Sequence, residues 1–183
     1  MDCIKEIKNK MKYIKKITKN FRYELGDYEI EDMGNPHNKP PSASKLKEGY
    51  SAVYIFIYKH ENGDYEFLKI GKANSKSIAR FTSQHYGFSA NSTLAKSLCD
   101  DKSFRKMIKE YKEYKGVNRN NVKSIKEYKG INKDSVKSWM LKKLWRINIY
   151  IKPDKEKIEL AKAELIEAVL HYEFRPRFEG NIH

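Results

Sequence analysis

Apolar residues recur at steps of three and four through residues 1–25, and lysines occupy many of the positions between them. This spacing predicts an amphipathic helix whose outer face is coated with lysine. Such a helix can lie on a membrane surface, or it can pack its apolar side on a core and present its lysines to phosphates. Packing on a core is favoured because no aromatic cluster marks a membrane anchor. Residues 34–44 then hold three prolines together with Gly, Asn and Ser, which predicts a linker or a long surface loop.

The hydrophobic pattern changes at residue 52, where eight consecutive positions up to residue 59 are rich in β-forming side chains. The turn signal Asn62-Gly63 follows, and residues 65–70 predict a second strand that Gly71 closes, so the two strands form a hairpin. Residues 144–151 alternate apolar and polar side chains, which predicts a third strand.

Helical patterns fill the rest of the compact part. They predict one helix from Ser75 or Ser77 through Arg80 towards His85, another from Leu94 through residues 104–114, and a last one over residues 155–172. Three short strands and these helices give a small mixed α/β (α+β) fold. We divide the chain into a basic helical arm with its linker, residues 1–48, and a compact domain, residues 49–183.

A tandem repeat lies inside an insertion that we place at residues 105–140. Residues 112–124 and 126–138 match at nine of 13 positions with an offset of 14 residues. Two copies of so short a unit cannot form a solenoid, so a duplication within a surface insertion is favoured. Its basic residues alternate with tyrosines, as in a nucleic-acid contact surface, and a solvated helical hairpin is the open alternative. The candidate DNA-binding residues are Lys115, Arg119, Lys123, Lys129, Lys133 and Lys137.

The amino-acid composition limits the classes of partner that the protein can bind. The chain has 183 residues, with 38 Lys plus Arg against 24 Asp plus Glu, and a formal charge of +14. That excess predicts a polyanionic partner, most often nucleic acid, although a lysine-biased genome explains part of it. The two cysteines exclude a disulfide scaffold and a cysteine-based zinc module. With neither a long apolar run nor a secretory pattern, we expect a soluble cytoplasmic protein with no membrane partner.

Polar residues at the element edges suggest phosphodiester chemistry. Hydrolysis of that bond needs a deprotonated water and stabilisation of charge on the phosphoryl oxygens. Arg80 is a candidate clamp for those oxygens, and Glu167 is a candidate ligand for one divalent cation, since Mg²⁺ often takes one carboxylate plus substrate phosphate. Lys69 and Lys72 flank Ile70-Gly71 in the second strand. A nearby lysine favours the phenolate form of a tyrosine, which makes Tyr54 a candidate general base.

The order and spacing of these residues resemble those of the GIY-YIG nucleases. The resemblance rests on Ala52-Val53-Tyr54, then Lys69-Ile70-Gly71, then Arg80, and then Glu167 nine residues before Pro176. Ala52 replaces the first glycine of the pattern. Lys69 stands in the place of the second motif tyrosine, as in a subset of restriction endonucleases of this family. Glu179 stands where the family tends to have an asparagine, and Asn181 lies two positions further on.

The resemblance implies a three-stranded antiparallel sheet flanked by helices and a type II restriction enzyme that cuts double-stranded DNA at specific sites. It implies that Tyr54 and Lys69 activate water, that Arg80 stabilises the phosphoryl group, and that Glu167 holds Mg²⁺, with Mn²⁺ as a possible substitute. Lys72 and His85 complete the candidate catalytic set, His85 as an extra phosphate or proton-handling group. Cutting both strands of a near-palindrome favours a homodimer.

Three alternatives stay open at this point. The chain can be another DNA nuclease of the same family, of the homing or repair type. It can be a non-catalytic nucleic-acid-binding protein on the same fold, in which Lys69 and Glu179 mark a lapsed site. It can also be a membrane-surface protein whose basic arm binds lipid headgroups.

Overall fold

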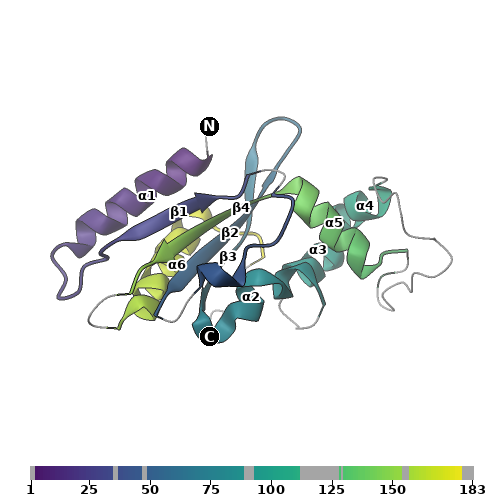
Figure 1. The fold of residues 1–183 in the computed structure, drawn as a ribbon. Helices are drawn as coiled ribbons and strands as arrows, with labels where there is room; N and C mark the ends of the chain where they lie inside the picture. Colours follow the sequence, from purple (N-terminus) through teal and green to yellow (C-terminus); the bar gives the residue numbers. More distant parts are fainter. Residues whose placement is uncertain are drawn as a thin grey trace.

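The computed structural model describes residues 3–34, 37–46, 49–88, 93–111, 128, 130–153 and 157–178. Its centre is one four-stranded antiparallel sheet with the strand order β1-β4-β2-β3 (Figure 1). The strands are β1 Tyr28–Asp32, β2 Ser51–Lys59, β3 Tyr65–Asn74 and β4 Leu144–Ile151. The α-helices are α1 Cys3–Thr18, α2 Ile78–Thr82, α3 Leu94–Asp100, α4 Lys102–Glu110, α5 Lys133–Lys143 and α6 Glu159–Phe174.

Two sets of helices cover the two faces of the sheet, since successive residues of a strand point to opposite faces. Val53, Ile55 and Ile57 of β2 pack in one fully buried cluster with Ile14 of α1 and Ile166 of α6. The alternate residues of β2, among them Tyr54 and Phe56, belong to a second cluster on the opposite face, which the helices α2 to α5 supply. Figure 1 shows α1 running alongside β1, with α2, α3 and α5 at the other side of the sheet.

The mixed α/β class is confirmed, but the three-stranded sheet expected from the sequence is wrong, because β1 adds a fourth strand. β1 lies between the helix and the loop of residues 1–48 and pairs with β4 from Tyr28 opposite Ile151 to Asp32 opposite Ile147. Three of its five residues are acidic, and no β1 residue is fully buried. A charged strand of this kind is typical of a sheet edge. The segment expected as an arm therefore packs against the sheet through both α1 and β1.

The hairpin expected from Asn62-Gly63 is present, and its second strand is longer than expected. The backbone N–H of His60 donates to the carbonyl of Asp64 at 2.8 Å, and Gly63 has a φ of +92°, which favours glycine. Gly71 does not end β3, which continues to Asn74. A bulge beside Phe56 shifts the register between the two strands.

The helices begin and end at different residues from those expected. α1 ends at Thr18 rather than near residue 25, and the Thr18 hydroxyl donates to the carbonyl of Ile14 at 2.9 Å. The helix expected from residue 94 onward is interrupted at Asp101, whose carboxylate caps α4 by accepting from the N–H of Phe104 at 3.1 Å. Such a side-chain cap begins a new helix. α6 begins at Glu159 and ends before Arg175, which has a left-handed φ of 44°.

Candidate active site

Tyr54 lies in the middle of β2 with only 2% of its surface exposed. It is opposite Gly71 of β3, and its ring covers that glycine so closely that a Cβ at position 71 would overlap the ring. The Tyr54 hydroxyl lies 2.7 Å from Nε2 of His85. His85 Nδ1 accepts a hydrogen bond from the backbone N–H of Leu94 at 3.4 Å, so in the neutral ring the proton is on Nε2. His85 therefore donates to the Tyr54 oxygen.

Lys69 and Arg80 bring positive charge to this tyrosine. Lys69 is opposite Phe56, which places it on the same face of the sheet as Tyr54, and it is 5% exposed. Burial lowers the pKa of Lys69, Arg80 lowers it further, and Glu167 raises it. Arg80 is an exposed residue of α2. Its charge acts on both Lys69 and Tyr54.

Lys72 and Glu167 meet on the opposite face of β3. Lys72 is opposite Val53, so it points towards α6, where its Nζ lies 2.7 Å from Oε2 of Glu167 and 3.7 Å from Oε1 of Glu164. The Glu167 carboxylate is also close enough to raise the pKa of both Tyr54 and Lys69. β3 is an edge strand of the sheet. The six residues expected from the sequence thus surround one sheet edge, from five separate elements.

The charge state of Tyr54 differs from the sequence-based expectation. Burial raises the pKa of Tyr54 well above its ordinary value, Arg80 and Arg146 act in the opposite direction, and Glu167 raises it further. The hydroxyl is therefore protonated at neutral pH, whereas the neighbouring lysine led us to expect a readily formed phenolate. Burial also lowers the pKa of His85 well below its usual range, helped by Lys69, Arg146 and Arg80. A neutral His85 is a donor to Tyr54, as its geometry requires.

Arg146 of β4 is a functional candidate that the sequence analysis missed. Its side chain is fully buried, and its guanidinium lies over the rings of Tyr54, Phe56 and Phe81 at 4.8–5.6 Å from their centroids. Its Nη2 donates to the backbone carbonyl of Phe81 at 2.6 Å, and its Nη1 donates to the hydroxyl of Tyr86 at 3.0 Å. Cation–π contacts of a desolvated guanidinium are strongly favourable. Arg146 therefore places a fixed positive charge beneath Tyr54.

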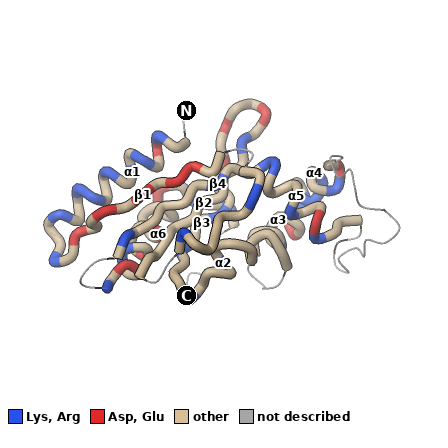
Figure 2. Tube along the Cα trace, viewed as in Figure 1, with Lys and Arg blue, Asp and Glu red and all other residues tan. Residues whose placement is uncertain are grey.

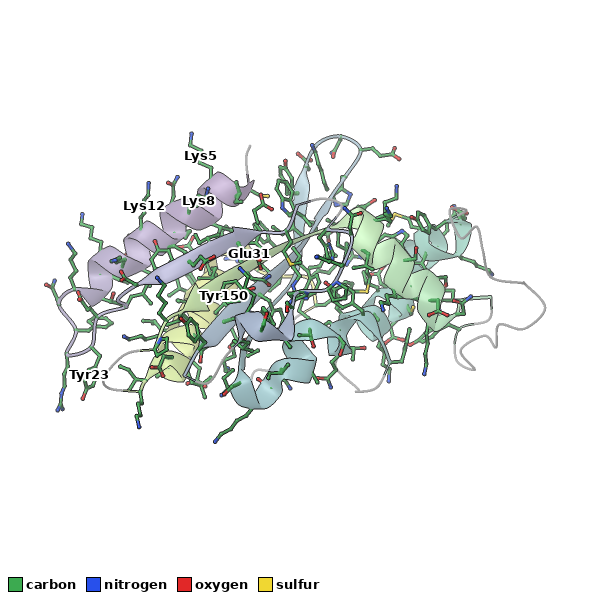
Figure 3. The ribbon with its side chains drawn as sticks, viewed as in Figure 1. Lys5, Lys8, Lys12, Tyr23, Glu31 and Tyr150 are labelled. Atoms are coloured by element: carbon green, nitrogen blue, oxygen red, sulfur yellow. The ribbon has the colours of Figure 1, made fainter. Side chains whose placement is uncertain are left out.

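A buried polar network connects Arg146 to the charged edge strand β1. Arg146 Nε donates to the side-chain oxygen of Asn148 at 3.0 Å, and Asn148 Nδ2 donates to the Glu31 carboxylate at 2.9 Å. The Tyr150 hydroxyl donates to the same oxygen of Glu31 at 2.6 Å, and Figure 3 shows these two side chains meeting between β1 and β4. Glu31 thus balances the buried guanidinium through an amide. The alternation Arg-x-Asn-x-Tyr in β4 was the sequence signal, since it puts three polar groups on one face.

The position expected for the cation offers the carboxylate of Glu167 as a ligand, and the carboxylate of Glu164 lies nearby. Glu164 and Glu167 lie one turn apart on α6 and both approach Lys72, where a positive charge is already stabilised. Within the described ranges, no three or more His, Cys, Asp or Glu side chains form a group that could surround a metal ion. This donor set fits a Mg²⁺ ion that keeps most of its waters and takes the rest of its ligands from a substrate phosphate.

His171 follows Glu167 by one turn of α6. Its Nε2 lies 3.1 Å from the backbone carbonyl of Ile70, to which only a protonated Nε2 can donate. Its Nδ1 is buried and accepts no hydrogen bond from any described residue. This histidine therefore attaches α6 to the edge of β3 beside the candidate site.

The insertion residues are placed only in part. Lys133 and Lys137 are exposed on α5, whereas Lys115, Arg119, Lys123 and Lys129 lie outside the described residues, as do Glu179 and Asn181. The second repeat copy is not purely a surface segment. Its Tyr128, Ile131 and Val136 are buried in the core beside α3 and α4.

No protein-family model matches the chain, and neither a curated protein nor a solved structure matches it. None of the helices in the described ranges is both long enough and apolar enough to cross a membrane.

Proposed function

We propose that the chain is a Mg²⁺-dependent endonuclease that hydrolyses phosphodiester bonds of double-stranded DNA, as the resemblance to GIY-YIG restriction enzymes implies. The observation that supports it best is the gathering of Tyr54, Lys69, Arg80, His85 and Glu167 around the edge strand β3. These residues are spread over more than a hundred positions of the sequence.

Each side chain has a role in this proposal that is consistent with its position. Arg80, the exposed cation, would hold the phosphoryl oxygens, and Lys69 would add a second positive charge beside them. A water proton passes to the Tyr54 phenolate while the water oxygen bonds to phosphorus and the bond to the leaving oxygen breaks. The leaving oxygen then takes a proton from solvent. His85 donates to the Tyr54 oxygen at 2.7 Å and so favours its anionic form.

Glu167, with Glu164 beside it, would hold the divalent cation, for which Mn²⁺ is the expected substitute. A cation of this kind stabilises negative charge on the phosphoryl group and on the leaving oxygen. Lys72 must give up its 2.7 Å contact with Glu167 for the carboxylate to act as a ligand. Lys72 is then available to a phosphate oxygen.

The site-specific, restriction-type activity and the homodimer belong to the same proposal. The formal charge of +14 supports a DNA partner, and the exposed Lys133 and Lys137 on α5 remain candidates for DNA contact. Two symmetric copies would cut both strands of a near-palindromic site.

A non-catalytic DNA-binding protein on this fold is the second candidate. Two observations favour it: burial keeps Tyr54 protonated, and an ammonium group already occupies the Glu167 carboxylate. Both features are compatible with hydrolysis only if substrate and cation change them.

The test is digestion of phage DNA by the purified protein with Mg²⁺, beside EDTA and a Glu167→Gln variant. Glu173→Gln is the matched control, because Glu173 lies on the same helix and pairs with Lys10 instead of Lys72. We expect discrete fragments from the wild type and from Glu173→Gln only. A smear would refute site-specific cutting. Intact DNA at every Mg²⁺ and Mn²⁺ concentration, with gel-shift binding retained, would refute hydrolysis and support the binding protein.

A further inference from the structure

One side of α1 carries a continuous row of exposed lysines. We call Lys5, Lys8, Lys12, Lys16 and Lys19 the lysine ridge; a spacing of three or four residues puts the first four on one face of α1, and Lys19 directly follows the end of the helix at Thr18. At 1.5 Å per residue the helical part of the ridge, from Lys5 to Lys16, is about 17 Å long. Figure 3 shows Lys5 and Lys12 extending outward from α1, away from the sheet.

Two lysines of α1 that lie outside the ridge are close to carboxylates. Lys10 pairs with Glu173 of α6 at 2.6 Å, and Lys15 lies 3.6 Å from Asp27. No ridge lysine forms a salt bridge with a residue in the described part of the chain. α1 itself contains Glu6 in its first turn, and Figure 2 shows further acidic residues along β1, on the side towards the sheet.

The buried side of α1 distinguishes between two kinds of anionic partner, a lipid membrane and a nucleic acid. A helix that binds a membrane inserts its apolar side into the lipid. The apolar side of α1 is already used, since Ile7, Met11 and Ile14 are completely buried against the sheet and α6. The exposed side of α1 therefore offers a partner only charged side chains on a packed helix. Such a surface can bind a polyanion without inserting into it.

We infer that the lysine ridge binds the phosphate backbone of duplex DNA. A strand of B-DNA has one phosphate per 3.4 Å of axis, so a helical row of about 17 Å faces several phosphates. Contacts of this type supply affinity and orientation and carry no base sequence. The inference goes beyond the proposed hydrolysis, because it concerns binding alone and holds whether or not the chain cleaves DNA.

None of the ridge lysines belongs to the candidate active site, although α1 also packs on α6, the helix that carries Glu167. α1 lies beside β1, and the candidate active site surrounds β3, which is the opposite edge of the same sheet (Figure 1). The ridge therefore adds a second DNA-binding surface, and its loss weakens binding without removing a group from the site.

The experiment compares two charge-matched double variants of the same helix. Lys8→Gln/Lys12→Gln removes two ridge charges, whereas Lys10→Gln/Lys15→Gln removes the two lysines that pair with Glu173 and Asp27. Binding to a labelled duplex of about 30 base pairs is measured by fluorescence anisotropy, without Mg²⁺, between about 50 and 200 mM salt.

We expect the ridge variant to bind about tenfold or more weakly and to reduce the salt slope by about two, since each phosphate contact contributes about 0.9. The control should keep the wild-type slope. Equal losses in both variants would show an effect of net charge alone, and unchanged binding by the ridge variant would also overturn the inference. If Lys8→Gln/Lys12→Gln unfolds in urea more easily than the wild type, Lys5→Gln/Lys16→Gln repeats the test.

Vesicles containing anionic lipid serve as the second probe. Because the apolar side of α1 is buried, we expect no vesicle binding that depends on the ridge at moderate salt. Vesicle binding lost in Lys8→Gln/Lys12→Gln while DNA binding is kept would overturn the inference in favour of a membrane surface.

Discussion

His37 makes the stability of this protein depend on pH, and its contacts fix how. Arg146 donates to the Tyr86 hydroxyl at 3.0 Å, so the Tyr86 proton points to Nε2 of His37, 2.8 Å away. His37 Nδ1–H then donates to the carbonyl of Leu144 at 2.8 Å. Only the neutral ring can accept from Tyr86 and donate to Leu144 at the same time. Protonation of His37 therefore breaks this chain of hydrogen bonds.

The loss of stability on acidification can be calculated from the pKa shift of His37. Burial lowers the pKa of His37 from 6.5 to about 4; the bond to Leu144 opposes this, and the Arg146 charge adds to it. At about 1.4 kcal/mol per unit, the shift is worth about 3 kcal/mol of unfolding free energy. Because the folded pKa is the lower one, this stability is complete above pH 6.5 and is lost as the pH falls to about 4. About 2 kcal/mol is gone by about pH 5.

The assay is urea unfolding of the wild type and of His37→Asn at about pH 8 and about pH 5, followed by tryptophan fluorescence, which buried Trp139 supplies. Asn keeps a donor for the Leu144 carbonyl and does not titrate. We expect the variant to be less stable at the higher pH by about 1–2 kcal/mol, and the wild type to lose about 2 kcal/mol more on acidification. Any contribution from His85 is common to both proteins and cancels.

His60→Asn is the control, since this histidine is partly exposed and pairs with Glu66 outside the core. It should show the same pH dependence as the wild type within about 0.5 kcal/mol. Equal losses on acidification by His37→Asn and the wild type would refute the reasoning, because His37 would then have no lowered pKa in the folded protein.

Three further predictions concern the candidate site. Gly71→Ala should lower the free energy of unfolding by about 1–3 kcal/mol in urea, because its Cβ overlaps the Tyr54 ring, whereas Gly87→Ala, with open space around it, should change little; equal effects would contradict the close packing. The rate of DNA cleavage should rise about tenfold per pH unit between about pH 7 and 9, since the raised pKa of Tyr54 leaves little phenolate; a rate independent of pH there would exclude Tyr54 as the base. Arg146→Met should slow cleavage at every pH between about 7 and 9 and Arg146→Lys should restore part of the rate, as the guanidinium favours the phenolate; an unchanged rate in Arg146→Met would contradict this role of Arg146.

Periodicity sufficed for the parts of the fold with strong local signals. The hairpin around Asn62-Gly63 and the strand of residues 144–151 have alternating or β-forming side chains with clear turn residues, and both are present. β1 could not be found this way, because Tyr28-Glu-Ile-Glu-Asp offers only two core-facing side chains. Its pairing with β4 stabilises it, and that pairing joins positions far apart in the sequence.

The candidate site likewise has features that the sequence pattern predicts and features that depend on the packing of the folded protein. Tyr54, Arg80 and Glu167 were selected by the order and spacing of their chemistry, which is visible in the sequence. The charge state of Tyr54 is not visible in the sequence. Burial of the side chain is a property of the packed protein, and its effect on the pKa of Tyr54 outweighs that of the neighbouring positive charges. Arg146 was missed since an arginine in a strand is usually a solvent-facing residue, and only the rings packed around it show that this one is buried.

The place of β1 in the sheet also has a consequence for the order in which the protein can fold during synthesis. Tyr28 pairs with Ile151, which lies 123 positions further along the chain. Contacts of such high sequence separation form slowly. Until β4 and α6 have left the ribosome, the apolar side of α1 can pack only on the hairpin of β2 and β3, and β1 has no strand to pair with, so its segment must stay in water by means of its own charges. The acidic residues of β1 and the lysines of α1 therefore keep this segment of the nascent chain hydrated before the folded protein forms.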